Sequence, residues 1–124
     1  MDLNFLLDDI IKNRRALHQI PETALEEVKT KKYLKNYLIS IGLEPQEIVE
    51  TGLFVYIEGK DKENCIAFRS DIDALNIKEE TGAEFESKHI GKMHACGHDG
   101  HMTTLLGFAK YLTTIQCSSY FPTC

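Results

Sequence analysis

Two segments near the start of the chain carry apolar residues at helical spacing, and this periodicity constrains the fold more than any other feature. Residues 3–18 repeat leucine and isoleucine every three or four positions, which predicts an amphipathic helix. A second helix is expected to begin near Thr23 and Glu26, a capping-box pair, and to end at Gly42. The first 42 residues therefore predict two helices, each with one apolar face.

The apolar pattern then changes from helical spacing to β-rich runs. Residues 53–58 and 65–70 are such runs, and the polar stretch between them predicts a hairpin or neighbouring strands. Residues 71–93 show little periodicity and are expected to form a loop, while helical spacing returns at about 102–113. Helices, strands and a further helix in this order favour an α/β fold.

Composition excludes several classes of function. The net charge is −5 and the basic residues are scattered, so no nucleic-acid or basic membrane surface is expected. No run approaches the roughly 18 apolar residues of a membrane span, and the first residues do not resemble a signal peptide. The four cysteines have no regular spacing, which predicts free thiols or metal ligands in a reducing cytoplasm.

The most informative stretch is Gly91 to His101, GKMHACGHDGH. It places His94, Cys96, His98 and His101 within eight positions, and thiolate with imidazole suits zinc and other late divalent metals. If residues 94–98 are extended, His94, Cys96 and His98 share one face. The alternative is a surface loop that gathers histidines by chance, with Cys96 as a small core residue.

Further candidate residues lie outside that stretch. Asp71 and Asp73 follow the second β-rich run, where ligands gather in open α/β sheets, and they are expected to orient a ligand histidine or contact a metal. A solvated acidic turn is the alternative for this pair. Asp99 is expected to hydrogen-bond an imidazole. His18 at a helix end is expected only to cap or pack.

These motifs occur in the order seen in one known family. The chain resembles the metal-dependent amidohydrolases and peptidases that include aminoacylases, hippurate hydrolase and auxin-conjugate (indole-acetyl amino acid) hydrolases. The matching residues are Arg14-Arg15, Leu17-His18, Pro21-Glu22, Arg69 to Leu75, Glu80-Thr81-Gly82 and Gly91 to Gly107. The most specific of them is the MHACGHDGH motif.

The resemblance implies hydrolysis of the amide bond of N-acyl amino acids by water activated between two divalent metals, zinc or manganese. Cys96 and His98 would then be metal ligands, and Asp71 would be a carboxylate that orients the site from behind the ligands. The complete enzymes would act on small molecules and form homodimers through an inserted domain.

The resemblance also implies that part of the enzyme lies outside this sequence. The expected fold is the N-terminal part, residues 1–113, of an incomplete three-layer α/β/α catalytic metallohydrolase domain. The glutamate that transfers the proton and the inserted dimerisation domain are absent, and residues 114–124 are expected to be an aberrant or disordered tail. The chain alone is therefore expected to be inactive. The alternatives are a non-catalytic metal-binding module and a non-functional remnant.

Overall fold

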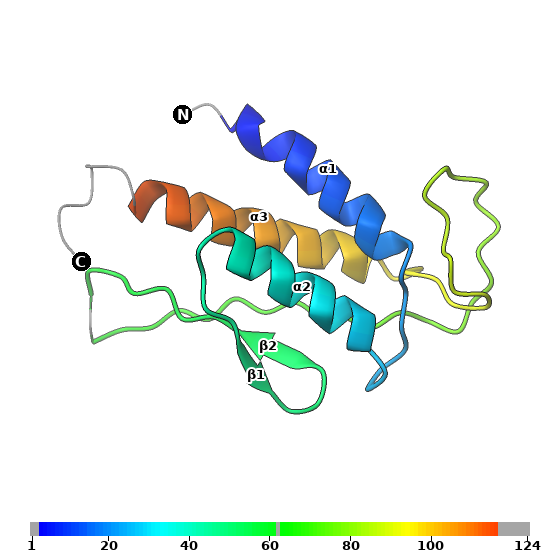
Figure 1. Ribbon diagram of the computed structural model, residues 1–124, viewed down its shortest axis with the longest axis horizontal. Helices are drawn as coiled ribbons and strands as arrows, with labels where there is room; N and C mark the ends of the chain where they lie inside the picture. The colour runs from blue at the N-terminus through cyan, green and yellow to red at the C-terminus, as the bar shows by residue number, and fades with distance from the viewer. Residues whose placement is uncertain (1–2, 62, 117–124) are drawn as a thin grey trace.

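Three helices and one short hairpin make up the regular structure. A computed structural model describes residues 3–61 and 63–116 of the chain. The elements are α1 (Asn4–His18), α2 (Val28–Ser40), β1 (Gln46–Ile48), β2 (Gly52–Phe54) and α3 (His98–Gln116). Figure 1 shows the hairpin beside α2, and the loop of residues 76–92 at the end of the molecule where α1 finishes and α3 begins.

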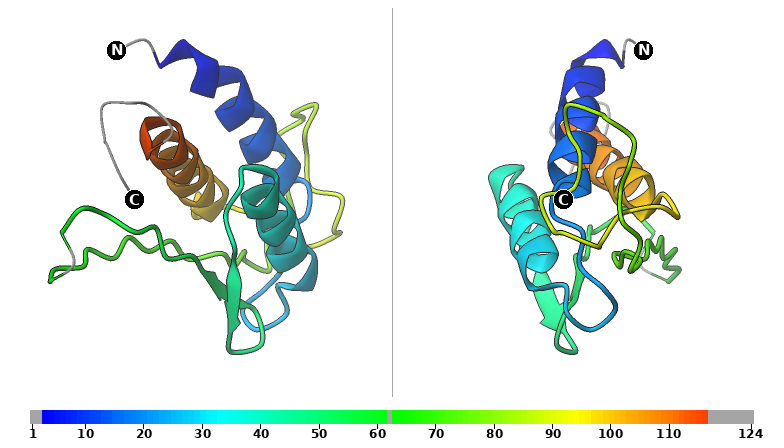
Figure 2. Two further views of the ribbon diagram at one scale, coloured as in Figure 1. Left: turned by 60° about the vertical axis from the view of Figure 1, so that its left-hand side comes forward. Right: turned by 90° about the vertical axis from the view of Figure 1, so that its right-hand side faces the viewer.

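The core lies between the three helices. Figure 2 shows the three helices gathered on one side of the hairpin. Leu17 of α1 is completely buried and lies in one cluster with residues of α2 and α3. The buried members of this cluster are Leu17, Leu34, Leu38, Met102, Leu106 and Ala109. Burying a side chain of this size contributes about 1.5–3 kcal/mol, so the cluster is the main apolar tie between the helices. It also sets where the end of α1 meets the start of α3.

The first helix agrees with the sequence prediction, but the second begins later than expected. Thr23 and Glu26 do hydrogen-bond, yet they form a turn, and α2 starts at Val28. The carboxylate of Glu22 accepts hydrogen bonds from the backbone N–H groups of Lys29 (3.1 Å) and Thr30 (2.7 Å). A carboxylate from outside the helix thus takes the capping role that the pattern assigned to Thr23.

The end of α2 follows the sequence prediction. Gly42 has a φ of +86°, the left-handed conformation that glycine adopts without strain. Its N–H bonds to the carbonyl of Ile39 and the N–H of Leu43 bonds to the carbonyl of Leu38, both at 3.0 Å. These two hydrogen bonds satisfy carbonyls that the helix leaves free, so Gly42 ends α2 as expected.

The predicted strands are mostly wrong. The observed antiparallel hairpin pairs Gln46–Ile48 with Gly52–Phe54, so only the first residues of the 53–58 run are in a strand. Within the described part of the chain, residues 65–70 pair with no strand, and Ile66 and Phe68 are exposed. The apolar pattern indicated β propensity, but propensity forms a strand only where a partner provides the hydrogen bonds.

The last helix is longer than predicted at both ends. It starts at His98, so His98 and His101 lie in its first turn and not in a loop. It continues to Gln116, which corrects the expected tail for residues 114–116. The rest of the expected tail, residues 117–124, lies outside the described residues. No helix in the described ranges combines the length and the apolar character needed to span a membrane.

Candidate metal and substrate site

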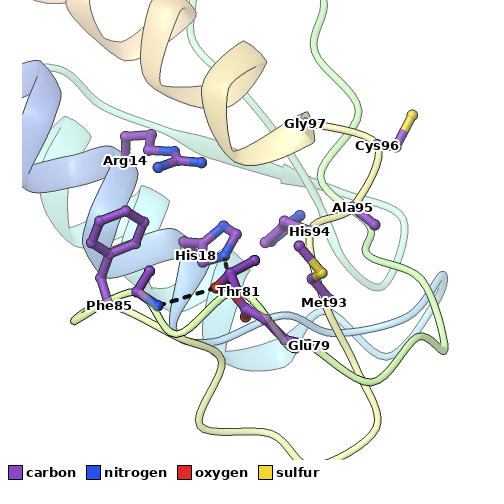
Figure 3. A pocket seen from close by; sticks show the side chains of 11 residues that line it. Arg14, His18, Glu79, Thr81, Phe85, Met93, His94, Ala95, Cys96 and Gly97 are labelled. Carbon is purple, nitrogen blue, oxygen red and sulfur yellow. Dashed lines mark hydrogen bonds and ion pairs between the residues drawn. The ribbon is translucent and has the colours of Figure 1, made fainter.

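A pocket of about 420 Å³ opens where three segments meet. They are the C-terminal part of α1, the loop of residues 79–85, and residues 93–97 just before α3. Figure 3 shows Arg14 and His18 facing His94 across this space, with Phe85 and Met93 as apolar walls. The pocket therefore combines polar groups from both ends of the chain with a partly apolar lining, as small-molecule sites do.

His18 is the buried centre of this site. Its Nδ1 lies 2.7 Å from Oδ2 of Asp99, and its Nε2 lies 2.9 Å from Oε1 of Glu79. The three side chains are at most 4% exposed. Each ring nitrogen thus lies within hydrogen-bonding distance of a different carboxylate. Arg14 adds a cation, with its Nε 3.0 Å from the same oxygen of Asp99.

Glu79 organises the loop that forms one wall of the pocket. Burial alone would raise the pKa of its carboxyl, but hydrogen bonds from the Thr81 hydroxyl, His18 and the Ser87 N–H outweigh burial and lower it. The distances are 2.7 Å to Thr81 Oγ1 and 2.7 Å to Ser87 N. Glu79 is thus an ionised acceptor that ties the loop to α1.

His94 has an unusual environment for a polar side chain. It is 4% exposed, and both ring nitrogens are buried without a hydrogen-bond partner among the described protein atoms. Burial lowers the pKa of His94, outweighing the nearby charge of Asp99, so its ring is neutral near pH 7. A neutral ring in this place leaves one buried donor and one buried acceptor unpaired at the wall of the pocket.

The two acidic residues singled out from the sequence do different things. The Asp73 carboxylate and its backbone carbonyl both lie 2.9 Å from Nδ1 of His98. Asp71 forms an exposed ion pair with Arg69 at 2.5 Å. The structure therefore brings Asp73, and not Asp71, to the imidazole of His98. With Nδ1 donating, Nε2 of a neutral His98 is the nitrogen free to bind a metal.

Cys96 and His98 are separated by a turn and do not lie on an extended strand. Residues 95–96 form the turn and Gly97 has a φ of +89°, so the expected common face of His94, Cys96 and His98 is absent. Cys96 is an exposed free thiol, and Figure 3 shows its sulfur directed away from His94. His101 is exposed, with its ring centre 5.7 Å from that of His98.

The donor atoms fit part of a metal site. Among residues 3–61 and 63–116, no group of three or more His, Cys, Asp or Glu side chains is arranged so that it could hold a metal ion, so the four-ligand module is not assembled. The thiol of Cys96 and the Asp73-held imidazole of His98 are nevertheless of the type that binds zinc, and an aspartate behind a histidine is the usual support for such a ligand. The residues present fit two ligands of a larger set.

The sequence alone did not identify His18 as the centre of the site. Its two carboxylate partners lie 61 and 81 positions away, and no local pattern reports contacts at that separation. Asp73 had a weak signal, since it alternates with Asp71 just after a β-rich run. Choosing between the two aspartates required the three-dimensional structure.

The lowered pKa of Glu79 predicts a specific acid response. The unfolded chain binds a proton at this carboxyl near its ordinary value of 4.5, but the folded protein binds it only at lower pH. Its contribution to stability is therefore full above pH 4.5 and is lost as pH falls through the folded pKa. In Glu79→Gln, the free energy of unfolding from urea titrations should fall less steeply below that pH than in the wild type. Equal slopes would contradict this assignment, and Glu44→Gln, an exposed carboxylate, should behave as the wild type.

Comparison with known proteins identifies relatives over most of the chain. Residues 67–120 match the model of peptidase family M20/M25/M40. N-acetyldiaminopimelate deacetylase of Leuconostoc citreum is 51% identical over 108 residues, which cover 83% of this chain and 28% of the relative. The enzyme of the same name from Listeria monocytogenes is 50% identical over 111 residues, covering 88% of this chain. The chain spans about 30% of the length of that relative.

A solved structure has the same fold. The YXEP protein of Bacillus subtilis, described as a dinuclear metal-binding peptidase of the M20 family, superposes with a TM-score of 0.86. It is 37% identical, and the match covers 91% of this chain and 32% of that protein. The helices and small sheet described above are therefore an α/β arrangement that occurs in M20 peptidases. The chain belongs to peptidase family M20/M25/M40.

Proposed function

We propose that this chain, through residues 1–113, is the N-terminal part of the catalytic domain of a metal-dependent amidohydrolase. The observation that carries this proposal is the support of His98 by Asp73, two residues after the free thiol Cys96. The likeness to a dinuclear metal-binding peptidase adds weight, because it extends over nine tenths of this chain. The remaining part of the domain and the inserted dimerisation domain would be supplied by sequence outside these residues.

Cys96 and His98 are proposed as two ligands of a site that holds two divalent metals, zinc or manganese. When bound, such metals lower the pKa of a water molecule and polarise the scissile carbonyl. In this chain Asp73 fixes the tautomer of His98 by accepting from Nδ1. The thiolate of Cys96 favours zinc, because sulfur is a soft ligand. Asp71 stays a proposed orienting carboxylate, although its partner here is Arg69.

The proposed substrates are N-acyl amino acids, with the acetyl group as the first acyl group to test. The two curated relatives are both named N-acetyldiaminopimelate deacetylase, which supports an N-acetylated diamino acid as the substrate class. The pocket has room for a short acyl group between Phe85 and Met93, with the neutral ring of His94 beside it.

Location and assembly are also part of the proposal. The described free thiols, Cys65 and Cys96, suit a reducing compartment, so the cytoplasm is proposed as the location. The other two cysteines, Cys117 and Cys124, lie outside the described residues. The complete enzyme is proposed to be a homodimer on the strength of the family resemblance.

Metal titration tests the two ligands directly. The chain should bind Co²⁺ and show thiolate-to-cobalt absorption, because Cys96 supplies the sulfur. Cys96→Ser should abolish that absorption, and His98→Gln should weaken binding by more than about 100-fold, since even the outer partners of a ligand contribute about 10–100-fold. Cys65→Ser is the matched control, because Cys65 is also an exposed free thiol. Equal loss in Cys65→Ser, or no binding by the wild type, would exclude the proposed site.

Activity assays separate this chain from the complete enzyme. The 124-residue chain should release no acetate from N-acetyldiaminopimelate, because the proton-transferring glutamate is expected outside it. A longer protein that contains this segment should release acetate, and a chelator should stop the reaction. If the 124-residue chain hydrolysed the substrate and Cys96→Ser abolished that hydrolysis, the proposal that this chain alone is inactive would be wrong. A metal-loaded longer protein that is inactive on a broad N-acyl amino acid panel would contradict the function.

A further inference from the structure

His18 does more than end a helix. It is the last residue of α1, it is 3% exposed, and both of its ring nitrogens are bonded to carboxylates from other parts of the chain. Glu79 comes from the pocket loop, residues 79–85, and Asp99 comes from the first turn of α3. One imidazole therefore connects the end of α1, the loop that carries Glu79 and the start of α3.

The bridge consists of buried polar groups that are costly to leave unpaired. A buried carboxylate loses its hydration, so removing the group that bonds it is strongly destabilising. Here each ring nitrogen of His18 lies within hydrogen-bonding distance of a carboxylate oxygen, and Arg14 also pairs with Asp99. These bonds hold only in one relative placement of α1, the loop and α3.

Asp99 transmits this placement to the proposed metal ligands. It is 1% exposed and follows His98 directly at the start of α3, where a negative charge is favourable. Two residues before Asp99, Gly97 has a φ of +89°, and the chain turns there between Cys96 and His98. A shift of the Asp99 side chain would therefore move the turn that presents both residues.

The ring of His18 also contacts the pocket directly. Phe85 meets it edge-on at 5.6 Å between ring centres, and His94 lies 6.4 Å away. The guanidinium groups of Arg14 and Arg15 lie over the Phe85 ring at 5.0 Å and 5.1 Å. The loop is thus packed onto the same face of α1 that carries the bridge.

We propose that His18 is a positioning residue for the metal-ligand segment. By bridging Glu79 and Asp99 it holds residues 94–99 against the loop of residues 79–87, and this sets where Cys96 and His98 lie. The effect on metal binding rests on the proposed function above. The effect on the segment itself does not depend on any metal.

A purely stabilising role and a positioning role make different predictions. A residue that only adds stability would, when replaced, raise amide hydrogen exchange throughout the fold in proportion to the lost free energy of unfolding. A positioning residue would loosen the two segments it joins and leave distant helical turns protected. The observable that separates them is the location of the change.

The first test is amide exchange in the metal-free, 124-residue chain. In His18→Gln, which keeps at most one of the two hydrogen bonds, exchange should rise at least about tenfold at Ser87, Gly100 and His101, whose N–H groups bond within the two segments. Amides within α2 should change by less than about threefold. A uniform rise, or no rise, would overturn the proposal. His89→Gln is the matched control, since His89 bonds the Pro21 carbonyl outside the bridge.

A second variant covers the case in which His18→Gln does not fold. Glu79→Gln keeps the size of the side chain and removes the charge that His18 meets on the loop side. If His18 transmits position, exchange should rise at Ser87 and also at Gly100 and His101, beyond the bridge. A rise confined to Ser87 would show that His18 transmits nothing to α3 and would overturn the proposal.

Co²⁺ binding then connects position to the proposed site. His18→Gln should bind Co²⁺ about tenfold more weakly than the wild type, with a shifted thiolate-to-cobalt absorption, and His89→Gln should bind within about twofold of the wild type. Unchanged affinity and absorption in His18→Gln would overturn the inference. If the wild type bound no Co²⁺, the proposed function would fail, while the exchange experiment would still decide whether His18 positions the segment.

Discussion

The arrangement of the site depends on one buried interaction, the bridge from Glu79 through His18 to Asp99. Its distances are 2.9 Å and 2.7 Å, and all three side chains are at most 4% exposed. Because charges in such a place are costly unless paired, the bonds fix the positions of α1, the pocket loop and the start of α3. The apolar core packs the helices together, and the bridge adds directed polar contacts where the end of α1 meets the loop and the start of α3.

The start of α3 places the proposed metal ligands relative to this bridge. His98 and Asp99 are consecutive, yet Asp99 points to the buried His18 and His98 bonds Asp73. The turn at Gly97 directs Cys96 outward. One face of this short segment is therefore anchored in the interior, and the other presents a thiol and an imidazole. This division of tasks agrees with membership of a family that includes a dinuclear metal-binding peptidase.

Local patterns predicted the features that local physics determines. Helical spacing located α1, and the left-handed glycine ended α2 at Gly42. The pattern at Thr23 predicts too early a start for α2. The carboxylate of Glu22 caps the helix instead, through hydrogen bonds to the N–H groups of Lys29 and Thr30. The pattern of residues 65–70 predicts a strand on propensity alone, but no strand pairs with it in the described part of the chain. At His18 the local sequence predicts only capping or packing, because its partners are remote in sequence.

The central claim is that Cys96 and His98 bind metal together, and X-ray absorption spectroscopy of the zinc-loaded chain tests it most directly. The account predicts one sulfur and one imidazole nitrogen in the first shell, with the remaining positions filled by oxygen. A shell made of oxygen alone, or a sulfur without an imidazole, would contradict it.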